Sequence, residues 1–443
     1  MQYKKLRHSM LALSLCFFSH NAASLTLQQA ILAADSYDTG IRAARELNDA
    51  EQQKRLQGFS GLLPQISLNG GFSKQDQPKA TYAAGVTRHN YSLNLSQPIF
   101  DVAKYATWKR AEAMADQGQI NYMLAQQQLI SDVSESWFSV AYAALALKNA
   151  QRTSSAFRQQ LRQAQRGLEL GEQTRLEVDE AQANYDNATV EVIIAESDLN
   201  NARIRFTKLT GLSGDLVPLN IMECFVPPPL PDLKKVKAQS NRHNLNVQLA
   251  SFTLNQSRAD VIASTGNHLP VITLQASYGN NWSRGQNEND FDTLFGTTSK
   301  TRNTNIGINV SVPIFAGGGH IAQSIEAAHR QEQSRQLLLD AQRKALEEAE
   351  RAWYSIMAGD AKIRAYQKSI SSAKKRLEST RYGKEMGQRT VLDMLNAESD
   401  YYKSLKEIAK ARYDYITANI QLAKATGELD YAYLNKFSCS SYN

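Results

Sequence analysis

The sequence predicts a mainly α-helical chain that also contributes four strands to a transmembrane β-barrel. Three observations support this fold class. Proline-free segments are longer than a globular core can hold, short stretches alternate between apolar and polar residues, and landmarks recur about 216 residues apart. We therefore expect two tandem repeats per chain, each with a pair of strands and a long helical hairpin.

Residues 1–24 have the parts of a secretory signal peptide. Three basic residues precede an apolar stretch from Met10 to Phe18, and small residues follow at Ala22 to Ser24. This stretch is too short to span a bilayer, and no later one approaches ~20 apolar residues, so any membrane crossing is predicted to use strands. Removing the three basic residues lowers the formal charge from +7 to +4. No basic block remains, which argues against nucleic acid as a partner.

The repeat is visible as matched motifs. Residues 25–226 are expected to form repeat 1 and residues 227–443 repeat 2, with the boundary at the stiff segment from Pro227 to Pro231. The matched pairs are Trp137-Phe138 with Trp353-Tyr354, Gly171 to Glu177 with Gly387 to Asp393, and Thr210-Gly211 with Thr426-Gly427.

Each repeat is expected to open with a helix, over residues 26–57 in repeat 1, and to continue as a strand pair. The strands are placed at about 62–75 and 88–100, and at about 268–283 and 301–316, where apolar residues alternate with Ser, Asn and Gln. Ten residues suffice for a tilted strand to cross a bilayer. Four strands leave edges that lipid does not tolerate, so three copies with twelve strands are predicted to close the sheet. A half-buried sheet in a soluble domain is the alternative.

Long helical hairpins are predicted over residues 103–211 and 320–427, followed by a C-terminal segment. The first proline-free helix would run ~100 Å at 1.5 Å per residue. Its apolar residues alternate at spacings of three and four, which is typical of a coiled coil. We interpret Trp137 and Trp353 as packing residues. The seam residues are Ile130, Val133, Trp137, Val140, Ala144 and Leu147, with Leu346, Ala349, Trp353 and Ile356 in repeat 2.

This order of elements resembles the TolC family of outer-membrane efflux proteins over essentially the whole mature chain. The segments Gln97 to Asp101, Val312 to Gly318 and Gly387 to Ala397 carry the resemblance. It implies a homotrimer in the outer membrane of a Gram-negative bacterium, with a 12-stranded β-barrel in lipid, a 12-helix α-barrel in the periplasm and an equatorial belt around the helices. It also implies a periplasmic adaptor (membrane fusion) protein and an inner-membrane ABC or RND transporter as partners, without cofactor or metal.

The resemblance further implies a gate at the periplasmic hairpin tips. Asp393 matches an aspartate of the pore constriction, and Asn396 stands where the family has a second aspartate. A ring of Asp393 side chains would favour cations. Arg389 matches the basic residue of the gate lock, Glu177 is its acidic counterpart, and Lys384 replaces a tyrosine of the lock. Ordinary solvated carboxylates at helix starts are the alternative for Asp393 and Glu177.

Two further expectations follow from the resemblance. The hairpin turns, with Gly171, Thr174, Gly387 and Thr390, would contact the adaptor. Cys224 and Cys439 fall in segments that look like the equatorial belt, so they are candidates for a disulfide; two free thiols are the alternative.

Other functions are less consistent with the sequence. No HExxH, CxxC, P-loop or GxGxxG motif occurs, so an enzyme is not expected. A periplasmic coiled-coil scaffold without channel activity would not explain the matched strands. Within the family, Cys16 follows Leu15 rather than a small residue, so no lipid anchor is expected. This favours an exit duct for type I protein secretion or TolC-like export over a multidrug outlet of an RND-type pump.

Overall fold

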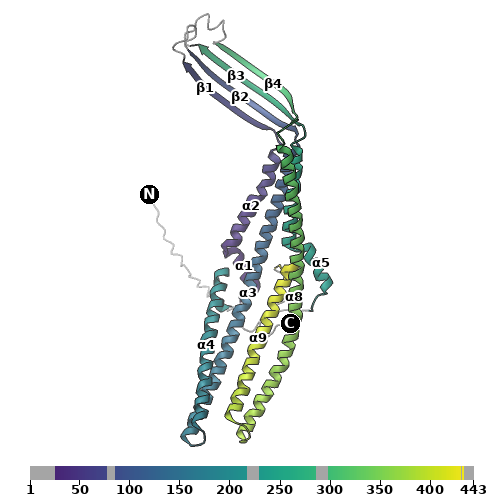
Figure 1. Cartoon of the computed structure of the whole chain (residues 1–443). Helices are drawn as coiled ribbons and strands as arrows, with labels where there is room; N and C mark the ends of the chain where they lie inside the picture. Colours follow the sequence, from purple (N-terminus) through teal and green to yellow (C-terminus); the bar gives the residue numbers. More distant parts are fainter. Residues whose placement is uncertain (1–24, 77–84, 217–228, 286–297, 431, 434–443) are drawn as a thin grey trace, which may run out of the picture.

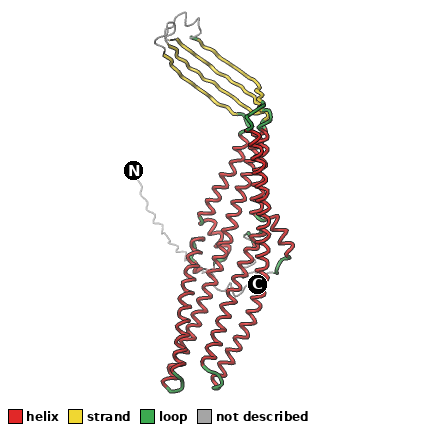
Figure 2. Tube along the Cα trace, viewed as in Figure 1, coloured by secondary structure: helices red, strands yellow, loops and turns green. Residues whose placement is uncertain are grey.

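The chain is long and narrow. The computed structural model describes residues 25–76, 85–216, 229–285, 298–430 and 432–433, so the predicted signal peptide lies outside the described residues. Four strands lie at one end, and the helices run from there to two turns at the other end (Figures 1 and 2). Among the helices of the described ranges, none combines the length and apolar character that a membrane span requires.

Each half of the chain opens with a broken helix. In repeat 1 the pair is α1 (Leu27–Tyr37) and α2 (Thr39–Ser60), and in repeat 2 it is α5 (Leu233–His243) and α6 (Leu245–Gly266). The carboxylate of Asp38 accepts a hydrogen bond from Ile41 N at 3.0 Å, and Asn244 accepts one from Asn246 N at 2.9 Å. The single helix expected over 26–57 is therefore two, because both polar residues act as N-caps.

The two helical hairpins have nearly equal dimensions. In repeat 1, α3 (Val102–Glu169, 68 residues) is followed by α4 (Arg175–Thr210, 36 residues) and the short 3₁₀ helix η1 (Gly214–Leu216). In repeat 2, α8 (Gly319–Glu385, 67 residues) is followed by α9 (Val391–Thr426, 36 residues). Both hairpins consequently end at the same level at the bottom of Figure 1.

The apolar core lies midway along the helices. Trp137 and Phe206 are fully buried and pack against each other with ring centroids 5.9 Å apart. A second cluster contains Ala349, Ile356 and Tyr415. Both predicted coiled-coil seams are therefore packed. Trp353 is only partly buried, and its Nε1 donates a hydrogen bond to the carbonyl oxygen of Pro231 at 2.8 Å, which ties α8 to the start of repeat 2.

The strands form one antiparallel sheet in the order β1-β2-β3-β4. Their bounds are Gln65–Asp76, Gly85–Phe100, Val271–Gly285 and Ser299–Ser311. Pro98 lies inside β2 beside a register irregularity, whereas β4 ends two residues before Pro313 and five before the expected 316. A proline lacks the N–H that a strand donates, so it needs such an irregularity or ends the strand.

Candidate functional site

One face of the sheet is apolar across most of its width. Ile66 pairs with Leu95, Leu95 with Ala276, and Ala276 with Ile306, so these four side chains form a row on the same face. The next row outward begins with Leu68 and continues through Leu93 to Tyr278. Side chains on this face are exposed: Leu68 is 73% and Ile306 is 72% accessible. An apolar surface of this kind requires a partner or lipid.

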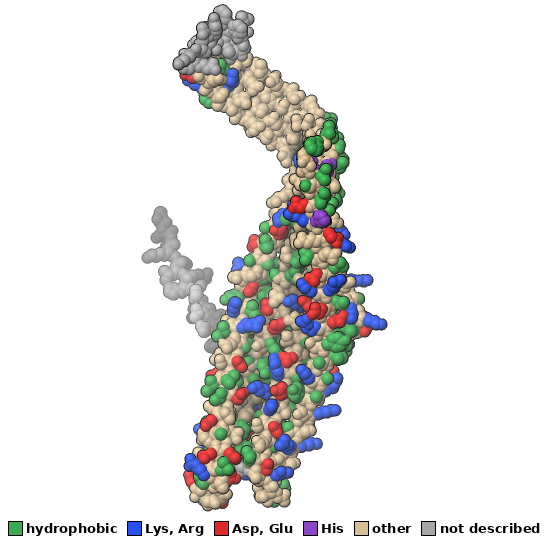
Figure 3. Space-filling view, viewed as in Figure 1, with side chains coloured by type: hydrophobic (Ala, Val, Ile, Leu, Met, Phe, Trp, Pro, Cys, Tyr) green, Lys and Arg blue, Asp and Glu red, His purple; other side chains and the backbone are tan. Residues whose placement is uncertain are grey.

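The opposite face is polar. Ser67 pairs with Asn94, Asn94 with Ser277, and Ser277 with Asn305, so the row adjacent to the first apolar row holds only hydroxyl and amide side chains. The sheet in Figure 3 correspondingly shows a broad surface without hydrophobic or charged colour along most of its length. The sheet can therefore separate an apolar environment from water.

Both edges of the sheet are open. Within the described residues, β1 is paired only with β2 and β4 only with β3, so each outer strand has unpaired backbone N–H and C=O groups. Backbone groups exposed to lipid without a hydrogen-bond partner cost several kcal/mol each. The sheet cannot enter a membrane by itself and has to pair with other strands.

Aromatic rings mark the end of the apolar face that lies away from the helices. His89 lies between Phe72 and Trp282, with ring centroids 4.8 and 4.9 Å apart. Aromatic rings at the ends of an apolar strand band are typical of the boundary between lipid and water.

The hairpin tips have the same turn in both repeats. Gly171 and Gly387 have φ angles of 75° and 73°, a region that favours glycine. In each turn the two residues after this glycine donate backbone hydrogen bonds to the carbonyl oxygen four positions before it, Gly167 or Gly383. Both acceptor glycines are close to a turn side chain: a Cβ on Gly383 would lie 2.9 Å from Arg389 Cγ. Sequence reasoning missed Gly167 and Gly383, although the shared Gly-x-x-x-Gly spacing is a signal for them.

A reciprocal cap starts the helix after each turn. Thr174 N donates to Glu177 Oε2 at 2.7 Å and Thr174 Oγ1 accepts from Glu177 N at 3.3 Å. Thr390 N donates to Asp393 Oδ2 at 3.1 Å and Thr390 Oγ1 accepts from Asp393 N at 3.1 Å. The hydrogen bonds from Thr390 lower the pKa of Asp393, with a smaller contribution from Arg389.

The structure separates the predicted lock residues. Glu177 is bound by its own cap, and Arg389 is exposed on the other hairpin; no ion pair in the described part of the chain joins the two. Lys384 is half-buried near the end of α8, where its carbonyl oxygen accepts from Gly387 N at 3.0 Å. Asn396 is exposed one turn after Asp393. Pairing of Arg389 with Glu177 within one chain is thus not observed and stays a prediction for contacts between copies.

A buried carboxylate joins the two hairpins, and sequence reasoning did not find it. Glu398 on α9 is only 4% exposed and accepts a hydrogen bond from Gln160 Nε2 on α3. Burial raises the pKa of Glu398, against the opposing effects of Arg381 and Gln160. The partners are 238 residues apart in sequence, so no local pattern could have paired them.

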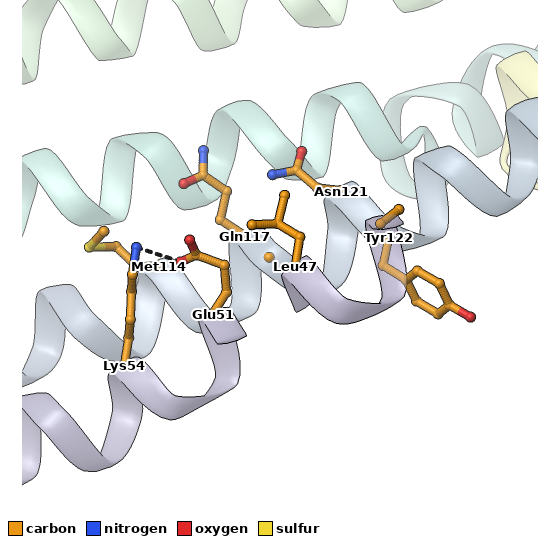
Figure 4. A pocket seen from close by; sticks show the side chains of 9 residues that line it. Leu47, Glu51, Lys54, Met114, Gln117, Asn121 and Tyr122 are labelled. Carbon is orange, nitrogen blue, oxygen red and sulfur yellow. Dashed lines mark ion pairs between the residues drawn. The ribbon is translucent and has the colours of Figure 1, made fainter. Parts of the chain in front are cut away.

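A pocket of about 260 Å³ lies higher up, between α2 and α3 (Figure 4). Lys54 on its wall pairs with Glu51 at 2.6 Å, and Gln117 donates to Thr253 Oγ1 on α6 at 3.2 Å. These side chains satisfy one another and present no nucleophile with an adjacent base. Within the described ranges no group of three or more metal-binding side chains occurs.

Cys224 and Cys439 lie outside the described residues, so their pairing stays a prediction.

Comparisons with known proteins agree with this geometry. A family model described as outer membrane efflux protein matches residues 34–212 and 236–428. The alkaline protease secretion protein AprF of Pseudomonas aeruginosa is 30% identical over 94% of this chain and 88% of its own length. The outer membrane protein TolC of Vibrio cholerae is 27% identical over 89% of both chains. The open state of the Neisseria gonorrhoeae MtrE outer membrane channel has a TM-score of 0.77 at 21% identity, over 90% of this chain and 88% of that one.

Proposed function

The chain belongs to the outer membrane efflux protein family, and on this premise we propose that three copies close their sheets into one barrel that continues as a helical duct. Family membership makes the protein an outer-membrane efflux channel of a Gram-negative bacterium. The proposal concerns how the chain builds that channel, what it carries and which residues control it. A periplasmic scaffold without a membrane channel is inconsistent with this family.

The two-faced, open-edged sheet is the observation that supports the proposal best. Its apolar face, which includes Leu68 and Ile306, would contact lipid, and its polar face, which includes Ser67 and Asn305, would line water. Pairing β1 of one copy with β4 of the next would satisfy both open edges. Four strands are too few for a closed transmembrane barrel, because known single-chain barrels start at about eight. Three copies would supply twelve.

The helical hairpins would extend the duct into the periplasm. The two turns around Gly171 and Gly387 lie at the end farthest from the sheet (Figure 1), where a periplasmic adaptor could reach them. A passive duct needs an energy source elsewhere, so we propose an inner-membrane transporter of the ABC or RND class as the third component. Catalysis by this chain is not part of the proposal.

The gate is proposed to lie at the same tips. Three Asp393 carboxylates around a threefold axis would form a negative ring, and the hydrogen bonds from Thr390 would favour the charged form of each carboxylate. Asn396 would contribute amides rather than charges to the next ring. Arg389 and Lys384 would hold the second hairpin inward through contacts with a neighbouring copy, with Glu177 as one acceptor.

Type I protein secretion is the cargo route that we favour, and a multidrug outlet is the alternative. The relative AprF is named for secretion of an alkaline protease, which supports protein cargo. In a strain that lacks this chain, the secretion route predicts that specific proteins disappear from the medium while drug susceptibility is unchanged. Increased drug susceptibility with unchanged extracellular protein would instead establish the multidrug outlet.

Arginine substitutions on the two faces of the sheet test the barrel. Leu68→Arg and Ile306→Arg would place charge in lipid, at a cost of about 2–4 kcal/mol per copy near the middle of the bilayer. We expect both variants to accumulate outside the outer-membrane fraction. The neighbouring variants Ser67→Arg and Asn305→Arg, on the water-lining face, should insert normally and shift ion selectivity toward anions. Equal insertion of all four variants would contradict the proposed orientation of the sheet.

A further inference from the structure

An aromatic patch lies where the helices of repeat 1 meet the sheet. Phe59 is at the end of α2, and Tyr105 and Trp108 are in the first two turns of α3. The ring centroid of Trp108 is 5.9 Å from that of Phe59 and 5.6 Å from that of Tyr105. Phe59 is 41% and Tyr105 47% exposed. The three rings, which we call the aromatic patch, therefore form one accessible surface.

The patch lies on the outer side of the helical wall. Arg110 of α3 pairs with Asp260 of α6 at 3.3 Å. The next residue, Ala111, faces α2, because a Cβ on Gly58 would lie 2.5 Å from its Cβ. Successive helix residues point about 100° apart, so α2 and α6 pack on one side of α3 and Tyr105 points about 120–140° away from both. That side is the convex one, which faces outward when the wall closes into a tube.

The patch also lies at the level where the lipid would end. The apolar side chains of β1 run from Phe72, at the far end of the sheet, to Ile66. This is about 20 Å along the strand, and less in height because barrel strands tilt. Barrels have an apolar band about 25 Å tall with aromatic residues at both ends. The band therefore continues past Ile66 through the exposed Leu63 to Phe59.

A lysine and a glutamate lie beside the rings. Lys109 Nζ is 4.2 Å from the ring centroid of Trp108 and 5.9 Å from that of Tyr105, which is a cation–π arrangement. The same ammonium donates to Glu112 Oε2 at 2.9 Å. A lysine ammonium has three donors and a carboxylate accepts several hydrogen bonds. Lys109 can therefore bind a further acceptor, and Glu112 a further donor.

The charges around the patch favour a ligand without net charge. The segment from Asp101 to Asp116 contains three carboxylates and three Lys or Arg. A purely anionic headgroup would gain Lys109 but would lie against the like charge of Glu112. A headgroup with both a phosphate and an ammonium satisfies the two side chains together.

We propose that the aromatic patch binds one phospholipid of the periplasmic leaflet whose headgroup is zwitterionic, such as phosphatidylethanolamine. Its phosphate accepts from Lys109, and its ammonium lies between the carboxylate of Glu112 and the ring of Tyr105. Within the described residues the Trp108 indole N–H and the Tyr105 hydroxyl have no hydrogen-bond partner, so both can donate to phosphate or ester oxygens. An acyl chain contacts Phe59. The inference rests on the proposed membrane orientation of the sheet.

Repeat 2 lacks a counterpart of this site. When the two Pro-Ile-Phe motifs that begin at Pro98 and Pro313 are aligned, Gln323 and Ser324 take the positions of the tryptophan and the lysine. These residues supply neither a ring nor a cation. We therefore expect one tightly bound phospholipid per copy of the chain.

Native mass spectrometry of the detergent-purified protein tests the site. Phosphatidylethanolamine and phosphatidylglycerol with the same acyl chains are titrated separately, and the protein should retain the zwitterionic lipid better, at one per copy. Lys109→Ala should weaken retention of both lipids roughly threefold to tenfold. Glu112→Gln should weaken retention of phosphatidylethanolamine alone, because it removes only the partner of the ammonium.

A matched control is Lys344→Ala, which breaks an exposed ion pair with Asp340 on α8 (2.8 Å) and should leave lipid retention unchanged. Equal retention by Lys109→Ala and Lys344→Ala, or unmodified protein without a preference for phosphatidylethanolamine, would overturn the site. Protein that still inserts into the outer membrane would in that case leave the channel intact. Unmodified protein that stays outside the membrane fraction would instead refute the proposed orientation of the sheet.

Free phosphoethanolamine, which has no acyl chains, distinguishes a lipid from a soluble compound with the same headgroup. At equal concentration it should not displace the bound lipid, because the acyl chains add apolar contacts with Phe59. Displacement at equal concentration would assign the site to a soluble phosphate compound and would contradict a lipid site.

Discussion

The two hairpin caps allow identical changes to be compared at two places. Thr390→Ala removes the hydroxyl that accepts from Asp393 N at 3.1 Å, and Thr174→Ala removes the hydroxyl that accepts from Glu177 N at 3.3 Å. Loss of a threonine N-cap costs about 1 kcal/mol. Local opening of the first turn should therefore be roughly fivefold more frequent, because 1.4 kcal/mol corresponds to a factor of ten.

Hydrogen–deuterium exchange at each tip measures that opening. Both alanine variants should exchange faster over their own first turn, and Thr390→Ser and Thr174→Ser, which keep the hydroxyl, should not. Under the proposed gate Thr390→Ala should increase the open time of the channel more than Thr174→Ala does, because Asp393 and Arg389 both belong to the second hairpin, whereas the first contributes only Glu177. An equal gain in open time for both alanine variants, or unchanged exchange in Thr390→Ala, would refute this reasoning.

The remaining predictions concern the buried side chains and the pore charge. Burial raises the pKa of Glu398, so the folded state binds a proton more tightly than the unfolded one, and stability falls as the pH rises from about 4.5 through the folded pKa. Glu398→Gln should remove that fall in thermal melts at successive pH values, and an unchanged pH profile would argue against it. Trp137 is fully buried, so Trp137→Ala should cost about 3–5 kcal/mol in urea denaturation, and Trp353→Ala less, since Trp353 is partly exposed. Asp393→Asn should reduce cation selectivity without unfolding the tip, because an amide can still accept from Thr390 N.

Local sequence patterns predicted the elements well. The period of two in Ile66 to Phe72 and the three-four spacing through Trp137 each reflect a face that repeats within a few residues, so strands and hairpins could be placed from sequence. The break at Asp38 was missed because a single polar residue inside a helical pattern is ambiguous until its side chain is seen to cap Ile41. Pro98 and Pro313 occupy matching positions in the two repeats. Pro98 is tolerated inside β2, but β4 ends at Ser311, before Pro313, so the matching motif placed the end of β4 too late.

The candidate site was less accessible to sequence reasoning. The caps of Thr174 and Thr390 follow a short spacing and are visible as Thr-x-x-acid motifs. The contact between Gln160 and Glu398 depends on how two hairpins from different repeats pack, which no local spacing encodes. The proposed contact between Arg389 and Glu177 would require a second copy of the chain, so neither the sequence nor one copy of the structure can show it.

Single-channel recording tests the central claim most directly. Purified protein in a planar bilayer should give discrete, long-lived current steps that favour cations, and Asp393→Asn should give steps of reduced cation preference. These results would establish both a water-filled duct and a charged constriction at the tips. A folded trimer that inserts into the bilayer but gives no current steps would contradict the account, because the closed sheet would then surround no continuous passage.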